Sequence, residues 1–136
     1  DALPEWDAAV SSYSARYGET YHPEYAQALT GRAQALLGLA RNADALAAAQ
    51  HAYALSQLRP GDVDAAALAD TRFTLARAKW ETNQDRKGAI DHAVWARDLW
   101  AKRGTLKADE LAEAELWLAQ RKTAWSAGIP RASSSE

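Results

Sequence analysis

The sequence AQALLGLARNADALAAAQHAYAL at residues 33–55 decides the fold. It predicts a helix, a tight turn and a second helix, with alanines where two helix axes come close. The pattern returns later: Ala33 matches Ala76, 43 residues on, and five positions of the second helix match residues 44 further along. These five pairs are Ala45 and Ala89, Leu46 and Ile90, Ala49 and Ala93, Ala52 and Ala96, and Leu55 and Leu99. A fixed period of this kind is typical of stacked repeat proteins.

The composition is that of one ordinary globular domain. The chain has 136 residues, 48% of them hydrophobic and 25% charged, which is enough to bury a core. The formal net charge of −2 provides no broad positive field, so we expect no nucleic-acid partner. Cysteine is absent, which excludes disulfides, thiolate metal sites and cysteine catalysis.

No targeting or membrane segment is evident in the sequence. No apolar run approaches the roughly 20 residues that a membrane-spanning helix needs, and no signal-peptide pattern opens the chain. Together with the lack of cysteine, this predicts a cytoplasmic location. The chain opens at Asp1 and contains no methionine. We therefore expect it to be a fragment of a longer protein.

Hydrophobic periodicity and helix breakers predict six helices and no strand. The predicted helices occupy residues 1–17, 23–41, 44–58, 63–82, a fifth stretch that ends before Gly104, and 107–127, with turns at 42–44 and 83–85 and N-caps at Asp62 and Thr105. The fold class expected is all-α, a single domain at 1–127 in which antiparallel helix pairs stack as a short α-solenoid. It comprises a half repeat (1–17), two repeats (18–59 and 60–103) and a C-terminal capping helix (105–127), followed by a flexible tail at 128–136.

The repeated alanines resemble those of tetratricopeptide repeats. Such a repeat has small residues on its first helix and an alanine that enters the second. The long spacing, with His22-Pro23 leading into a first helix, is similar to the kinesin-light-chain-like branch, and the stretch at 72–80 through 117–119 resembles the ends of repeat arrays attached to bacterial serine/threonine kinases. The resemblance implies a non-catalytic module that binds a protein or peptide.

We predict no catalytic, metal or cofactor site. The three histidines, His22, His51 and His92, are far apart in sequence and are expected at helix surfaces or turns. Phosphate-binding glycine loops and hydrolase motifs are missing. Five of the six tryptophans lie in the C-terminal half, where they either form an aromatic ligand surface or fill the gap between the last repeat and its cap; we favour the second.

The polar residues on the first helix of each pair are the candidate site. In stacked helix pairs these helices line a concave surface that commonly binds partners. The candidate residues are Gln27, Thr30, Gln34, Asp70, Phe73, Thr74, Arg77 and Glu81. They predict a protein or peptide partner. Two alternatives stay open: the same residues are merely solvated, or the domain is a structural element that packs on a neighbouring domain or a second copy of itself.

Overall fold

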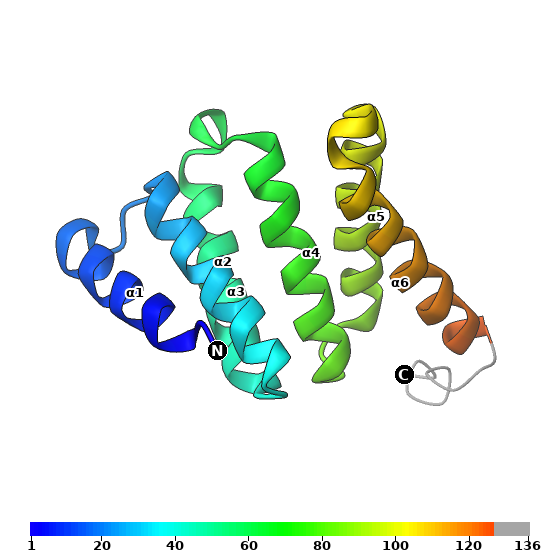
Figure 1. Cartoon of the computed structure of the whole chain (residues 1–136), viewed down its shortest axis with the longest axis horizontal. Coiled ribbons are helices and arrows are strands. Elements are labelled where there is room, and N and C mark those ends of the chain that lie inside the picture. Colours follow the sequence, from blue (N-terminus) through cyan, green and yellow to red (C-terminus); the bar gives the residue numbers. More distant parts are fainter. Residues whose placement is uncertain (127–136) are drawn as a thin grey trace.

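The computed structural model of the chain describes residues 1–126, and within that range every element is helical (Figure 1). The order is α1 (Leu3–Tyr17), α2 (Pro23–Gly38), α3 (Asn42–Leu58), η1 (Pro60–Asp62), α4 (Ala65–Glu81), α5 (Arg86–Lys102), η2 (Gly104–Lys107) and α6 (Ala108–Ser126). The prediction of an all-α protein with six α-helices is thus confirmed for the described residues. The predicted tail at 128–136 and the side chain of Trp125 lie outside what the structure describes.

The helices stack as a short helical repeat. Each α-helix packs on the next one in the chain, and α2 also packs on α4. In Figure 1, α2, α4 and α6 lie towards the viewer, with α3 and α5 behind them. This nearest-neighbour arrangement is the one the repeated sequence predicts, because each helix pair can bury its apolar side only against another pair.

The repeated alanines lie at the helix contacts, as predicted. Ala33, Ala49, Ala76 and Ala93 all have no exposed surface. The remaining alanines of the repeat are equally buried: Ala45, Ala52, Ala89 and Ala96. A methyl group at these points lets two helix backbones approach closely, so equivalent alanines in the two repeats give the same helix spacing.

The first turn lies three residues earlier than predicted. The expected turn at 42–44 is wrong, because α3 already begins at Asn42. The chain reverses at 39–41, where Arg41 N–H donates to the Leu36 carbonyl and Ala40 N–H donates to the Leu37 carbonyl. These bonds form a Schellman motif, and they place Ala40 in the left-handed region with φ of 59°.

The second turn repeats the first and accounts for the change of period. Asn83 has φ of 56°, and Gln84 N–H donates to the Lys79 carbonyl, each 43 residues after its counterpart. One extra residue, Asp85, then caps α5 by accepting a hydrogen bond from Gly88 N–H at 3.0 Å. The spacing is therefore 43 residues before this insertion and 44 after it, and the predicted turn at 83–85 is confirmed.

Replacing Ala40 by glycine should stabilise the fold. Alanine at a left-handed position carries strain that glycine does not, and Ala40 is exposed, so Ala40→Gly should raise the free energy of unfolding by about 0.5–1 kcal/mol. Urea denaturation followed by circular dichroism measures the change. Ala47→Gly, at an exposed position inside α3, should lower stability by a similar amount. Destabilisation by both variants would contradict the Schellman assignment.

Two predicted N-caps are corrected. Asp62 ends the 3₁₀ turn η1 and pairs with Arg59 at 2.8 Å, whereas Asp64 caps α4 by accepting from Ala67 N–H at 3.0 Å. Thr105 lies within η2, so α6 starts at Ala108. In both cases a short 3₁₀ turn precedes the α-helix, and the residue expected to cap the helix lies within that turn.

The last helix covers the end of the stack. Its inner face buries Ala114, Trp117 and Leu118 in a cluster that also contains the buried residues Phe73, Ala76, Trp80 and Trp100 of α4 and α5. The Phe73 ring meets Trp100 and Trp117 edge to face, with centroids 5.7 and 5.8 Å apart. The outer residues Glu113, Glu115, Gln120 and Lys122 are exposed. Trp80, Trp100 and Trp117 therefore fill the contact between the second repeat and α6.

One histidine is buried, contrary to the expected surface position. His92 is 9% exposed and accepts a hydrogen bond at Nδ1 from Arg72 Nε at 2.9 Å. The Arg72 guanidinium lies over Trp95, 4.6 Å from the ring centroid. Burial, and then the charge of Arg72, lower the pKa of His92 to about 4. His92 is thus neutral at pH 7 and joins α4 to α5 as an acceptor.

Stability should fall as the pH is lowered from 7 to 5. The folded pKa of His92 is below the unfolded value of 6.5, so the unfolded chain binds the proton more strongly and is favoured as the pH drops through 6.5. After allowance for solvent screening, the loss is about 1 kcal/mol. Urea midpoints at the two pH values measure it. His92→Gln should flatten the profile, and an unchanged slope in that variant would assign the effect elsewhere.

Candidate binding groove

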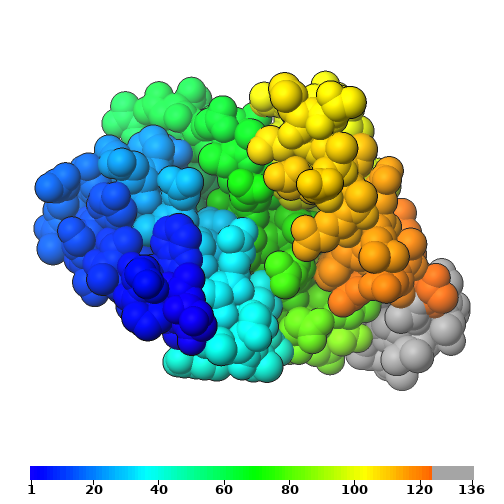
Figure 2. Space-filling model, viewed as in Figure 1, coloured from blue at the N-terminus to red at the C-terminus, as the bar shows by residue number. Residues whose placement is uncertain are grey.

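One face of the stack is hollowed along α4. Figure 2 shows α4 recessed between α1 and α2 on one side and α6 on the other. On α2 the residues Gln27, Thr30, Gln34 and Leu37, and on α4 the residues Asp70, Arg77 and Glu81, recur at helical spacing and share this face. We call it the groove face. It contains an N-terminal hollow of about 220 Å³ and a C-terminal hollow of about 340 Å³.

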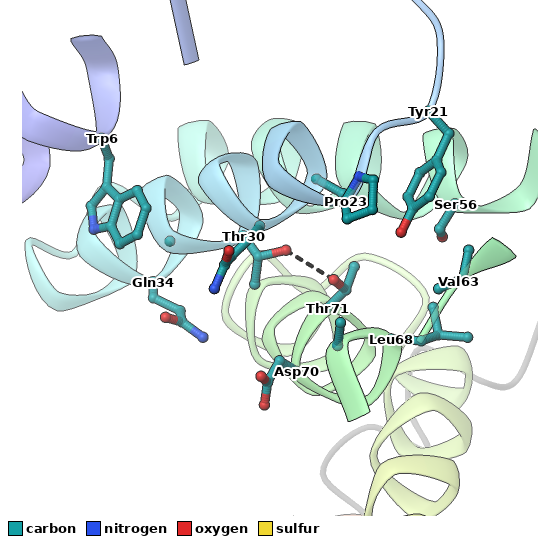
Figure 3. A pocket seen from close by; sticks show the side chains of 14 residues that line it. Trp6, Tyr21, Pro23, Thr30, Gln34, Ser56, Val63, Leu68, Asp70 and Thr71 are labelled. Carbon is teal, nitrogen blue, oxygen red and sulfur yellow. Dashed lines mark hydrogen bonds between the residues drawn. The ribbon is translucent and has the colours of Figure 1, made fainter. Parts of the chain in front are cut away.

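The N-terminal hollow lies between α1, α2 and α4. Its floor is a buried hydrogen bond between the hydroxyls of Thr30 and Thr71, 2.9 Å apart (Figure 3). Beside it, Gln34 Nε2 donates to Thr74 Oγ1 at 3.2 Å. These two bonds join the first helices of both repeats, and they fix the Gln34 side chain in place.

Trp6 forms the end wall of this hollow. Its indole rests on Gly31, where a Cβ atom would lie 2.5 Å from two ring carbons. Asp7 Oδ1 and Arg32 Nε form an ion pair at 2.7 Å and hold the same two helices together. The position of α1 thus depends on the missing side chain at Gly31, which lets the indole lie flat against α2.

Asp70 is the charged residue that lines the N-terminal hollow. Among the described residues, no hydrogen bond or ion pair reaches its carboxylate. Burial raises the pKa of Asp70, and the nearby charges of Glu110 and Asp64 raise it further, while Lys107 opposes them. Asp70 is exposed to solvent at the rim of the hollow, and no counter-ion among the described residues contacts its carboxylate.

The C-terminal hollow is lined by paired charges and two leucines. Arg121 Nη2 lies 3.7 Å from Glu81 Oε2, and the Arg121 guanidinium stacks over Trp117 at 4.8 Å from the ring centroid. Leu116 is 61% exposed, and together with Leu37 it adds an apolar edge. This half of the groove face combines both signs of charge with exposed apolar surface.

The structure brings six of the eight predicted site residues to the groove face. Gln27, Thr30, Gln34 and Asp70 line the N-terminal hollow, and Arg77 and Glu81 line the C-terminal one. Thr74 is 2% exposed and lines neither hollow, but its hydroxyl accepts the hydrogen bond from Gln34 Nε2. Phe73 is corrected: its ring is 6% exposed and packs between Trp100 and Trp117 in the core, so it lines neither hollow.

Several lining residues were not among the predicted ones. Trp6, Tyr21, Val63 and Leu68 add large apolar side chains to the lining of the N-terminal hollow. Trp6 had a signal in the sequence, because a glycine inside a helix often marks a close approach, and Gly31 lies in the middle of α2. Tyr21 precedes α2, Val63 follows η1 and Leu68 lies in the first turn of α4, and no local pattern indicates that these three meet.

The remaining histidines serve local structure. His22 Nδ1 accepts from Glu24 N–H at the start of α2, and its ring stacks on Tyr17 at 4.0 Å. His51 Nε2 lies 3.0 Å from Glu19 Oε1. Within residues 1–126, no group of three or more His, Asp or Glu side chains is placed to hold a metal ion. No helix in that range is long and apolar enough to span a bilayer.

No family model, curated protein or solved structure matches the chain. Function is therefore inferred from the groove face itself.

Proposed function

We propose that this chain is a non-catalytic binding module of the tetratricopeptide type, which holds a segment of a partner protein along the groove face. The observation that supports this most is the character of that face: Gln27, Gln34, Asp70, Arg77 and Glu81 follow one side of two adjacent helices and leave two hollows between them. A peptide backbone needs such polar groups, and its side chains need such hollows.

The groove face is already ordered before a partner arrives. Thr30, Thr71 and Thr74 tie α2 to α4, and the Trp6 indole is held against Gly31. A receptor that is ordered in advance spends little binding free energy on its own conformation. We place the module in the cytoplasm, where it would supply recognition and no chemistry of its own.

Self-association is the second candidate, and Leu116 favours it. This side chain is 61% exposed beside Leu37 on the groove face, where a second copy could cover it. Sedimentation at rising concentration separates the two functions. A dimer that dissociates in the Leu116→Ser variant supports self-association, whereas a monomer at all concentrations supports the peptide-binding module.

Peptide binding should depend on the groove face and not on the outer helices. Peptides selected from a random 12-residue phage library should bind the parent at least fivefold better than the Gln34→Ala and Arg77→Ala variants, because each change removes polar contacts worth about 1 kcal/mol. Gln50→Ala, an exposed position on α3, is the matched control. Fluorescence anisotropy of the synthetic peptides measures affinity, and equal binding by all variants would contradict the proposal.

A further inference from the structure

The N-terminal hollow offers hydrogen-bond acceptors that have no partner. Among the described residues, the Asp70 carboxylate has no hydrogen-bond or ion-pair partner. Gln34 donates through Nε2 to Thr74, and its amide oxygen has no partner in the same part of the chain. Figure 3 shows Gln34 and Asp70 projecting from α2 and α4 on the same side of the Thr30–Thr71 pair. Gln27, one turn before Thr30, adds a second amide to the same lining.

The charge of the hollow is uncompensated. Asp70 supplies its one formal charge among the lining residues. The charge of Lys107 acts on Asp70, but Lys107 Nζ is paired with Glu110 Oε2 at 3.9 Å. A carboxylate at the edge of a hollow, with no cation in contact among the described residues, is stabilised by a cation that can also donate hydrogen bonds.

The size of the hollow favours a single side chain. Its volume of about 220 Å³ lies below the roughly 300–1,000 Å³ of sites that enclose a whole small molecule. On the other side of Trp6, a separate shallow depression shares the lining residues Trp6, Gly31 and Gln34 and extends to Gly38 and Leu39. The remainder of an extended peptide has a path there along α2, which a free amine would not use.

We propose that the N-terminal hollow receives a lysine or arginine side chain of the partner segment, with Asp70 as its counter-ion. The amide oxygens of Gln27 and Gln34 accept its remaining N–H groups, and the Trp6 indole packs against its methylene stem. This inference rests on the proposed function, since it names the residue that the groove face selects. The specificity of the module is then set by one charge on α4.

Selection from the random 12-residue phage library tests the inference directly. Peptides that bind the parent should share a lysine or arginine at one aligned position. Synthetic versions should lose about tenfold in affinity for Asp70→Asn, as expected when a charge-assisted hydrogen bond is replaced by a neutral one. Asp91→Asn, an exposed aspartate on α5, is the isosteric control and should bind like the parent. Circular dichroism melts establish that both variants fold.

A double-mutant cycle separates a direct pair from a general loss of charge. Replacing the shared basic residue of the peptide by glutamine should cost about tenfold on the parent and less than twofold on Asp70→Asn. Equal costs on both proteins would overturn the pairing. A second probe, Nα-acetyl-arginine amide alone, should bind at least a hundredfold more weakly than the peptide; comparable binding would overturn the assignment to a peptide side chain.

The outcomes also distinguish this inference from the proposed function. Selected peptides that lose affinity on Gln34→Ala but carry no shared basic residue would leave the binding module intact and refute the role of Asp70. Failure to select any peptide that depends on Gln34 or Arg77 would refute both.

Discussion

Cutting the chain after Gly104 should lower the melting temperature sharply and produce aggregation. The cut removes Trp117 and Leu118, and it uncovers Trp80 and Trp100, which α6 helps to bury. Loss of one buried tryptophan alone costs about 3–5 kcal/mol, and monomers seldom expose a continuous apolar patch of the size left behind. Thermal melts and sedimentation velocity measure the two effects.

A chain that ends at Ser126 is the control, since it keeps all of α6. It separates the loss of the helix from the loss of the final ten residues. If the fragment that ends at Gly104 stays monomeric and melts with the parent, α6 is an extension rather than a cap. The exposed residues of α6, including Leu116, would then become the better candidates for partner binding.

Enlarging the contact alanines should destabilise both repeats by similar amounts. Ala49 and Ala93 are fully buried at equivalent positions, so leucine at either one must push two helices apart. Overpacking of this kind costs about 1–3 kcal/mol. Urea denaturation of Ala49→Leu and Ala93→Leu measures the cost.

The control for overpacking is Ala54→Leu, which adds the same atoms at an exposed position of α3. Its free energy of unfolding should stay within about 0.5 kcal/mol of the parent. Parent-like stability in Ala49→Leu or Ala93→Leu would remove the structural basis for aligning the two repeats.

The sequence predicted the helical stack because alanines repeated at a fixed spacing are best explained by contacts between closely packed helices. It did not predict the turn at 39–41, because Ala40 occupies a position where glycine is the usual signal, while Asn42 and Asp44 look like turn residues. In the structure Asp44 instead pairs with Arg41 at 2.9 Å in the first turn of α3. Local residue propensity predicted the turn at 42–44, whereas the hydrogen bonds from Arg41 and Ala40 to the Leu36 and Leu37 carbonyls place it at 39–41.

The groove face was predicted in part, and the reason lies in helix geometry. Gln27 aligns with Asp70 and Gln34 with Arg77, each 43 residues apart. Equivalent positions of the two repeats point the same way, so the alignment predicts these residues on one face. Phe73 failed because it belongs to the same stripe as Ala69, Ala76 and Trp80, which faces α5 and α6. For Trp6 the sequence offers only the indirect signal of Gly31 inside α2, because periodicity does not encode which residue of α1 contacts that glycine.

Because tryptophan is unevenly distributed along the chain, fluorescence and circular dichroism report on different parts of the molecule. Of six tryptophans, Trp6 belongs to α1, and the other five follow residue 79. Tryptophan emission therefore reports mainly on α4, α5 and α6, whereas far-ultraviolet ellipticity weighs all six helices by length. A stack held by neighbour contacts can lose helices from one end first. Unfolding that starts at α1 would reduce ellipticity before the emission maximum shifts, and unfolding that starts at α6 would reverse that order.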